Sequence, residues 1–327
     1  MAIRGINRFM VILFALLLCG CGKSPSVSNE YSTWFVYWGG EDATQEIYYY
    51  PSSSKFSVFA VSFNKKGEFT IPNQVTNYSF LGKKGYLTFV NDLPDQSEKS
   101  LELANWIVKN DSTRKKYAKE IVELTSSYGF GGVELDFENL GKDEMVWKKY
   151  GEFIKLVDKV CQEKGIDLKV VVEPGVPFHL LPSPNSISYV IMCYNLYGSF
   201  SGPGPKADVF FINKVLELSS SLKKRTLAFA TGGYDWTENR NAKAITEKDA
   251  INLKRQYHVR ATRHTGAIFF EYKDVSGACH QVWYADARTL LTWRDIGKSK
   301  GVHSFAFWRA GGNLDVTLEQ IVKDVEK

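Results

Sequence analysis

The sequence predicts an α/β fold of the TIM-barrel class, a parallel (β/α)8 barrel with a small α+β insertion between its seventh strand and its seventh helix. Apolar runs of strand length alternate with helical patterns along most of the chain, which implies a parallel sheet. Eight such units fit the 327 residues, a length that suits one barrel domain. An open doubly wound sheet is the alternative, but no glycine fingerprint follows a strand.

Eight apolar runs are the candidate strands. Each run has the length of an ordinary strand and is bounded by polar or helical sequence. In chain order they are residues 34–38, 56–63, 86–90, 131–137, 168–172, 189–194, 226–230 and 303–308.

The clearest predicted helix spans residues 143–164. Its apolar residues fall on one face at helical spacing, and they are Val146, Tyr150, Phe153, Ile154, Val157, Val160 and Cys161. Asp143 can cap the start of this helix, and Gly165 can end it. A second helix is predicted over residues 112–126 by a similar pattern.

Two intervals break the alternation. Residues 178–188 contain two prolines and are too few for a full helix. Residues 232–284 form a long interval that contains a helical pattern at 247–257 and strand-like runs at 267–272 and 280–284. We interpret this interval as the α+β insertion, placed over the upper rim of the barrel.

Residues 1–20 are predicted to be a lipoprotein signal peptide. Arg4 and Arg8 give a basic start, and the apolar run 9–18 is too short to span a bilayer but suits a secretory signal. The alternative is a simple signal peptide that is cut nearby.

The end of this segment resembles a bacterial lipobox, because the small residue Gly20 precedes Cys21. In such a motif the cysteine is acylated and becomes the mature N-terminus, which anchors a folded domain to a membrane. Residues 21–30 are therefore expected to be a lipidated tether, and residues 31–327 the barrel. The expected location is the bacterial cell envelope, facing outside the cytoplasm.

The composition excludes several classes of protein. Apolar residues make up 44% and charged residues 24%, so wholesale disorder and a multi-pass membrane protein are excluded. The net charge is only +5, and no basic run is interleaved with aromatic residues, so no nucleic-acid partner is expected. Cys161, Cys193 and Cys279 show no C-x-x-C spacing, so neither a metal site nor a disulfide framework is supported. We expect a monomer.

The fourth predicted strand carries the most information about function. Because side chains alternate along a strand, Val133, Leu135 and Phe137 would face the surrounding helices. Glu134, Asp136 and Glu138 would then line the barrel interior. Three carboxylates are costly to bury, so this pattern indicates a functional site. The alternative is a surface strand with a solvated polar face.

Glu138 lies at the C-terminal end of this strand, where the active sites of such barrels lie. Asp136 lies one inward step below, roughly 6.6 Å along the strand. Two acids this close do not both ionise freely, so one should keep its proton to a higher pH. A protonated Glu138 beside an ionised Asp136 is the arrangement needed to protonate a glycosidic oxygen.

The segment resembles the signature of glycoside hydrolase family 18, the chitinase-like family, which reads D-G-x-D-x-D-x-E. The third Asp and the catalytic Glu of that signature match Asp136 and Glu138. The first Asp is replaced by Gly131 and the second by Glu134, where a carboxylate is retained.

Other segments extend the resemblance. Met192-Cys193-Tyr194-Asn195 looks like the family motif M-x-Y-D, with Asn195 in the place of the Asp. Trp308 resembles the tryptophan that floors the subsite of cleavage. A resemblance to the spore-germination and cortex-lytic branch of this family rests on residues 34–38, 201–205, 233–236 and 280–288.

Further side chains are candidates for contact with substrate. The resemblance places Glu134, Asn195, Trp308 and the two tryptophans Trp38 and Trp236 in this group. Asn91, just past the third predicted strand, would either reach the cleft or cap a turn. The tryptophans and Tyr194 also have a purely structural interpretation as packing residues.

The resemblance implies a substrate-assisted retaining mechanism without a cofactor or metal. Glu138 would protonate the leaving oxygen, Asp136 would orient the substrate acetamido group, and Tyr194 would hold its oxygen. The implied partner is an N-acetylglucosamine-containing polysaccharide, peptidoglycan rather than chitin. Two alternatives stay open, a non-hydrolytic glycan-binding lipoprotein on the same barrel and an endo-β-N-acetylglucosaminidase acting on N-glycans.

Overall fold

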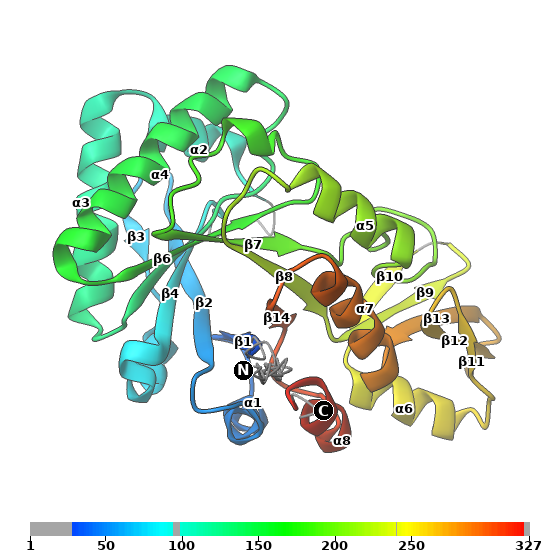
Figure 1. The fold of residues 1–327 in the computed structure, drawn as a ribbon. Coiled ribbons are helices and arrows are strands. Elements are labelled where there is room, and N and C mark those ends of the chain that lie inside the picture. The colour runs from blue at the N-terminus through cyan, green and yellow to red at the C-terminus, as the bar shows by residue number, and fades with distance from the viewer. Residues whose placement is uncertain (1–27, 94–98, 240, 324–327) are drawn as a thin grey trace, which may run out of the picture.

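A computed structural model gives the structure of this chain and describes residues 28–93, 99–239 and 241–323. In this described part, eight parallel strands close into a barrel, which confirms the predicted fold (Figure 1). The order around the barrel is β1-β14-β8-β7-β6-β5-β4-β2, and β1 pairs with β2 to close it. The strands are β1 (Glu30–Val36), β2 (Lys55–Phe63), β4 (Gly85–Val90), β5 (Gly132–Asp136), β6 (Asp167–Val172), β7 (Ile187–Met192), β8 (Arg225–Ala230) and β14 (Ser304–Trp308).

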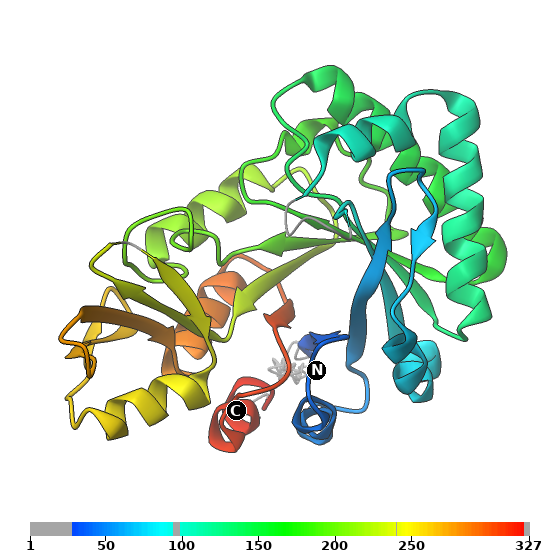
Figure 2. The ribbon, with the colours of Figure 1, turned by 180° about the vertical axis from the view of Figure 1, so that it is seen from behind.

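Helices surround the strands on the outside, as both faces of the ribbon show (Figures 1 and 2). They are α1 (Glu41–Gln45), α2 (Leu101–Val108), α3 (Asp111–Ser127), α4 (Glu144–Lys164), α5 (Val209–Leu218), α7 (Ala287–Ser299) and α8 (Asp315–Ile321). Three 3-10 helices lie in the connections, η1 (Glu46–Tyr49), η2 (Asn73–Lys84) and η3 (Phe178–Leu180). No described helix is both long and apolar enough to cross a membrane.

The ends of α4 follow the predicted capping residues. The Asp143 side chain accepts a hydrogen bond from the Met145 backbone at 2.8 Å, which satisfies a free amide of the first turn. Gly165 ends the helix in the left-handed region at φ 64°. Helix α3 begins earlier than predicted, because Asn110 forms a capping box with Thr113.

The insertion is a second, antiparallel sheet beside the barrel (yellow to orange in Figure 1). Its order is β10-β9-β13-β12-β11, and α6 packs on one face through a small apolar cluster. The predicted runs at 267–272 and 280–284 are strands of this sheet, and the hairpin of β9 and β10 was not predicted. The elements are β9 (Gly232–Thr237), β10 (Ala242–Ile245), α6 (Glu247–Gln256), β11 (Thr262–His264), β12 (Ala267–Lys273) and β13 (Cys279–Ala285).

The structure also places the interval 178–188 and the start of the barrel. The proline-rich interval 178–188 contains only η3, in agreement with the expectation that it is too short for a full helix. Strand β1 begins at Glu30, so the predicted tether and β1 share that residue, and a two-residue strand, β3 (Phe69–Thr70), pairs with β2. The predicted signal peptide and Cys21 lie outside the described residues.

The core has an outer and an inner part. Val133, Leu135 and Phe137 are buried in the large layer between strands and helices, as their alternation predicted. A smaller apolar cluster fills the barrel interior around Trp34, Met192 and neighbouring small residues. The side chains at the even positions of β5 therefore face the interior.

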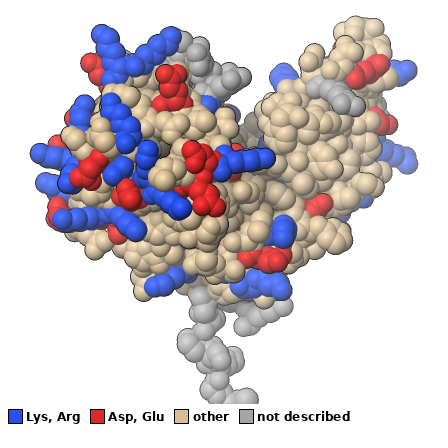
Figure 3. Space-filling model, turned by 90° about the horizontal axis from the view of Figure 1, so that it is seen from above, with Lys and Arg blue, Asp and Glu red and all other residues tan. Residues whose placement is uncertain are grey.

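Charged side chains on the outer helices are solvated and mixed in sign. Figure 3 shows Lys and Arg interspersed with Asp and Glu on the side of α3 and α4, and a hollow between this side and the insertion. Exposed pairs such as Lys119–Glu123 at 3.6 Å and Lys148–Glu144 at 3.5 Å lie one helical turn apart. Such pairs contribute little to stability, about 0.3–0.5 kcal/mol each.

The backbone at the start of β5 explains why Gly131 stands in the place of the first Asp of the signature. Gly131 passes close to the end of η2, and its amide donates to the Gly85 carbonyl at 3.0 Å. A Cβ on Gly131 would lie 2.4 Å from the Lys83 carbonyl oxygen and 2.7 Å from the Lys83 Cα. These atoms belong to the backbone and cannot rotate away, so only glycine fits without a shift of the chain.

The substitution Gly131→Ala is therefore expected to lower the free energy of unfolding by about 1–3 kcal/mol, the usual range for overpacking. Urea denaturation measures this change. Gly175→Ala is the control, because no atom lies within 4 Å of its Cβ position, and its effect should stay within about 0.5 kcal/mol. Equal losses at the two positions would contradict the steric explanation.

Candidate active site

The predicted catalytic residues gather at the C-terminal end of the barrel, where parallel strands end together. Asp136 is the last residue of β5, and Glu138 follows it. Tyr194 lies just past β7, and Trp308 ends β14. The negative charges of Glu138 and Asp136 act directly on the Tyr194 phenol, so the acids and the phenol lie close together.

Glu134 is fully buried beneath this end, at 0% exposure. Its Oε1 accepts from Trp34 Nε1 at 2.6 Å and from Thr88 Oγ1 at 2.8 Å, and its Oε2 accepts from Ser57 Oγ at 2.7 Å. These donors come from β1, β4 and β2, so Glu134 ties four strands together inside the barrel. The prediction that Glu134 contacts substrate does not fit this position, because three protein donors already occupy its oxygens.

Lys99 brings a positive charge to the acids. This residue lies between β4 and α2, and its Nζ is 2.7 Å from Glu138 Oε1, 3.2 Å from Asp92 Oδ1 and 3.8 Å from Asp136 Oδ2. Lys99 was not predicted, because a single lysine in a connection has no pattern that separates it from surface lysines. Its place depends on the bridge between Asp92 and Lys99, which brings the residue before α2 back beside the end of β4.

The two predicted catalytic acids, Asp136 and Glu138, differ in their surroundings. Burial raises the pKa of Asp136 well above its usual range, Lys99 opposes this, and the charge of Glu138 adds to it. Burial also raises the pKa of Glu138, whereas the charge and the hydrogen bond of Lys99 lower it. Since Lys99 lies closer to Glu138 than to Asp136, its charge favours the ionised form of Glu138 more strongly, which opposes the expected protonated Glu138 beside an ionised Asp136.

Asn91 holds the backbone of Glu138. Its Nδ2 donates to the Glu138 carbonyl at 2.9 Å, and its Oδ1 accepts from the Glu138 amide at 2.9 Å. The Asn91 side chain is 0% exposed and does not reach the open cleft, so its interpretation as a substrate contact is replaced by a positioning role. Glu173, past β6, fixes the backbone directly after Glu138, because its Oε2 accepts a hydrogen bond from the Asn139 amide at 2.8 Å.

Tyr194 is buried, and its phenol stays protonated. Burial raises its pKa well above the usual range, and the charges of Glu138 and Asp136 add to this effect. The phenol can therefore donate a hydrogen bond at neutral pH. Asn195 lies beside Tyr194 and is half-buried, with its Nδ2 3.6 Å from the Met192 sulfur.

A row of aromatic rings crosses the barrel end next to the acids. Trp308 lies 5.7 Å from Trp34 and 5.4 Å from Phe59 between ring centroids. Phe59 in turn lies 5.8 Å from Trp38, and the Lys99 ammonium is 5.3 Å from the Phe59 ring. Trp38 is 52% exposed, so much of its ring is accessible to solvent. Phe59 was not predicted, because it lies inside an ordinary apolar strand.

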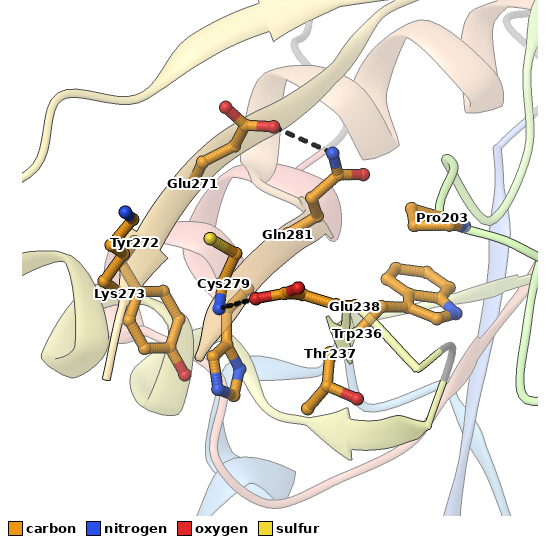
Figure 4. Close-up of a pocket in the computed structure, with 10 residues that line it drawn as sticks. Pro203, Trp236, Thr237, Glu238, Glu271, Tyr272, Lys273, Cys279 and Gln281 are labelled. Atoms are coloured by element: carbon orange, nitrogen blue, oxygen red, sulfur yellow. Dashed lines mark hydrogen bonds between the residues drawn. The ribbon is translucent and has the colours of Figure 1, made fainter. Parts of the chain in front are cut away.

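Trp236 belongs to the insertion and not to a barrel strand. It lies on β9 of the insertion, where it lines a cavity of about 510 Å³ with Pro203 and Gln281 (Figure 4). Its side chain is 1% exposed and packs 5.3 Å from the Tyr234 ring. An indole this deeply buried has no free face for a sugar, so the structure favours the packing interpretation of Trp236.

A TIM barrel with paired acids at the C-terminal end of a strand is an arrangement that glycoside hydrolases use. Residues 34–313 match Glycosyl hydrolases family 18. Because this match spans most of the chain, the chain belongs to that family, and it is an enzyme that hydrolyses glycosidic bonds.

Curated relatives are similar over much of the chain. The chain is 22% identical over 286 residues to a cortical fragment-lytic enzyme of Bacillus cereus, an alignment that covers 80% of this chain and 65% of that protein. It is 25% identical over 233 residues to a cortical fragment-lytic enzyme of Bacillus anthracis, covering 65% of this chain and 54% of that protein. The chain thus spans about half to two thirds of the length of these relatives.

Solved structures show the same fold. The spore cortex-lytic enzyme SleL of Bacillus cereus superposes with a TM-score of 0.77 at 19% identity, covering 90% of this chain and 74% of that one. A chitinase from Chromobacterium violaceum ATCC 12472 superposes with a TM-score of 0.79 at 18% identity, covering 92% of this chain and 100% of that chain.

The buried position of Glu134 gives a test of its structural role. Glu134→Ala removes the acceptor of three buried donors, so we expect a loss of about 3 kcal/mol in the free energy of unfolding. Glu134→Gln keeps one carbonyl oxygen for Trp34 and Thr88 and should lose about 1 kcal/mol. Urea denaturation of both variants measures this difference, and an alanine variant as stable as the glutamine variant would contradict it.

Proposed function

We propose that this glycosidase hydrolyses β-1,4-linked N-acetylglucosamine glycans, with peptidoglycan as its substrate, by a substrate-assisted retaining mechanism. One observation carries the proposal. The buried Oδ1 of Asp136 has no hydrogen-bond partner among the described residues, although it lies beside Glu138 at the barrel end. A buried acceptor without a partner is unfavourable unless a ligand supplies the donor, and the acetamido N–H of the substrate is such a donor.

The proposed reaction uses three side chains. Glu138 protonates the leaving glycosidic oxygen while the acetamido oxygen of the substrate attacks the anomeric carbon, which gives an oxazolinium ion. Asp136 accepts from the acetamido N–H and stabilises the developing positive charge, and the Tyr194 phenol donates to the acetamido oxygen. Glu138, now ionised, removes a proton from a water molecule as this water attacks the anomeric carbon and opens the oxazolinium ring.

The substrate class is proposed from the relatives. Proteins named cortical fragment-lytic enzymes are among them, and their name favours peptidoglycan. Chitinases share the fold, so chitin oligomers are the comparison substrate in any assay. The exposed Trp38 and the half-buried Trp308 offer rings on which the apolar face of a sugar can stack.

Glu138→Gln is expected to reduce glycan cleavage by about 100-fold or more, because the amide cannot supply the proton. Ser24–Lys327, which contains every described element, would be incubated with peptidoglycan and with chitin oligomers, and mass spectrometry would identify the new reducing ends. The matched control is Glu123→Gln, an exposed change on α3 in the described structure that should leave cleavage unchanged. Full activity of Glu138→Gln would reject this residue as the acid, and binding of intact glycan without cleavage would reject hydrolysis.

We also propose that the protein is a monomeric lipoprotein of the bacterial envelope, anchored through Cys21 and facing outside the cytoplasm. The direction of β1 supports this arrangement. Glu30 begins β1 at the N-terminal end of the barrel, whereas Glu138 and Asp136 lie at the opposite end. A tether from that end would turn the catalytic end away from the membrane and toward the surrounding glycan.

Cys21→Ala is expected to move the full-length protein out of the membrane fraction, because stable anchoring requires acyl chains. Fractionation of cells that express the chain, followed by mass spectrometry of the N-terminus, measures both the location and the lipid. Cys279→Ala changes an exposed free cysteine on β13 and is the control, for which membrane association should persist. Retention of the Cys21→Ala variant in the membrane would contradict the anchor.

A further inference from the structure

Lys99 occupies a position that the roles of Glu138, Asp136 and Tyr194 do not explain. Its ammonium contacts three carboxylates, and no other described Lys or Arg forms an ion pair with them. The closest of these contacts, 2.7 Å, is to the acid that must donate a proton. An ammonium at this distance stabilises the ionised form of Glu138, which is the form required of a base rather than of an acid.

The backbone holds Lys99 in place. The connection after β4 closes on itself through a bridge between Asp92 and Lys99, and the Ser100 amide donates to the Asn91 carbonyl at 2.8 Å. The Ser100 side chain then caps α2 by accepting from the Leu103 amide at 3.1 Å. The ammonium is mostly buried and also lies against the Phe59 ring. Lys99 is therefore a constrained residue and not a mobile surface cation.

The titratable groups that interact with Lys99 or with its two partners Asp136 and Glu138 are mostly acidic. Asp92 past β4 acts on Lys99 directly, and the groups that act through the two acids are Glu134 on β5, Tyr150 on α4, Glu173 past β6 and Tyr194 past β7. With one cation among several acids, removal of that cation makes every ionised carboxylate in the cluster less stable.

We propose that Lys99 is a positioning residue that holds Glu138 ionised until substrate binds, and that it thereby sets the pH range in which the two catalytic acids work. This inference rests on the proposed role of Glu138 as the acid. When the glycosidic oxygen reaches Glu138, the proton of the acid pair moves to Glu138, and Lys99 keeps its charge and shifts to Asp92 and to the carboxylate that remains ionised. After the first step Lys99 again stabilises ionised Glu138, which is then the base.

The test compares two substitutions that change the local charge in opposite directions. Lys99→Met removes a positive charge, so the pKa of Glu138 is expected to rise by about one unit or more, a tenfold or larger increase in proton affinity. Asp92→Asn removes a negative charge, so the pKa of Glu138 is expected to fall. Carbon-13 NMR titration of the side-chain carboxyls measures both shifts without substrate, and Glu138→Gln assigns the signal.

Activity gives the second readout. The bell-shaped pH profile of kcat/KM should move to higher pH in Lys99→Met and to lower pH in Asp92→Asn. Lys99→Arg keeps the charge and should restore the Glu138 titration of the unmodified chain to within a few tenths of a unit. Thermal melts of all three variants show whether each variant is folded. If Lys99→Met does not fold, the test is made with Asp92→Asn and Lys99→Arg.

The outcomes separate this inference from the proposed function. Unchanged titration of Glu138 in Lys99→Met, or shifts of the same sign in Lys99→Met and Asp92→Asn, would overturn the role of Lys99. If Lys99→Met does not fold, an unchanged or raised pKa of Glu138 in Asp92→Asn would overturn it as well. Opposite shifts without cleavage of any glycan would support the electrostatic role and reject the hydrolase proposal.

Discussion

The negative charge on the inner face of β5 is the constraint on which the rest of this structure depends. A carboxylate inside a barrel is unfavourable unless it is hydrogen-bonded, paired or protonated, and each solution is used once. Glu134 is hydrogen-bonded by donors from β1, β2 and β4, Glu138 is paired with Lys99, and the raised pKa of Asp136 favours its protonated form. The deepest acid thus fastens the barrel, and the two at its end remain available for chemistry.

This arrangement has a consequence for stability. Burial raises the pKa of both Asp136 and Glu138 above the values of the unfolded chain. Between the unfolded and folded pKa values the native state binds more protons, so this contribution to stability is present at low pH and is lost as the pH rises through the folded pKa values. Two buried acids of this kind, held close together, therefore lower the stability of the native state at neutral pH, a cost that is common at functional sites.

The predictions that succeeded rest on local patterns. Strand-length apolar runs gave all eight barrel strands, and the alternation in β5 correctly separated buried apolar residues from the inward acids. The predictions that changed concern residues whose role depends on distant partners. Asn91 holds the Glu138 backbone and Trp236 is buried in the insertion, and neither outcome follows from their neighbours in sequence.

The sequence by itself determined the barrel, the insertion and the pair Asp136 and Glu138, because periodicity and spacing along one strand are local properties of the chain. Tertiary structure alone decided how the surroundings of the two acids differ, because that depends on Lys99, which reaches the site from another connection. It also decided that Gly131 cannot carry a side chain, because the Lys83 backbone lies against it. Electrostatic and steric effects act through space, so residues far apart in sequence set them.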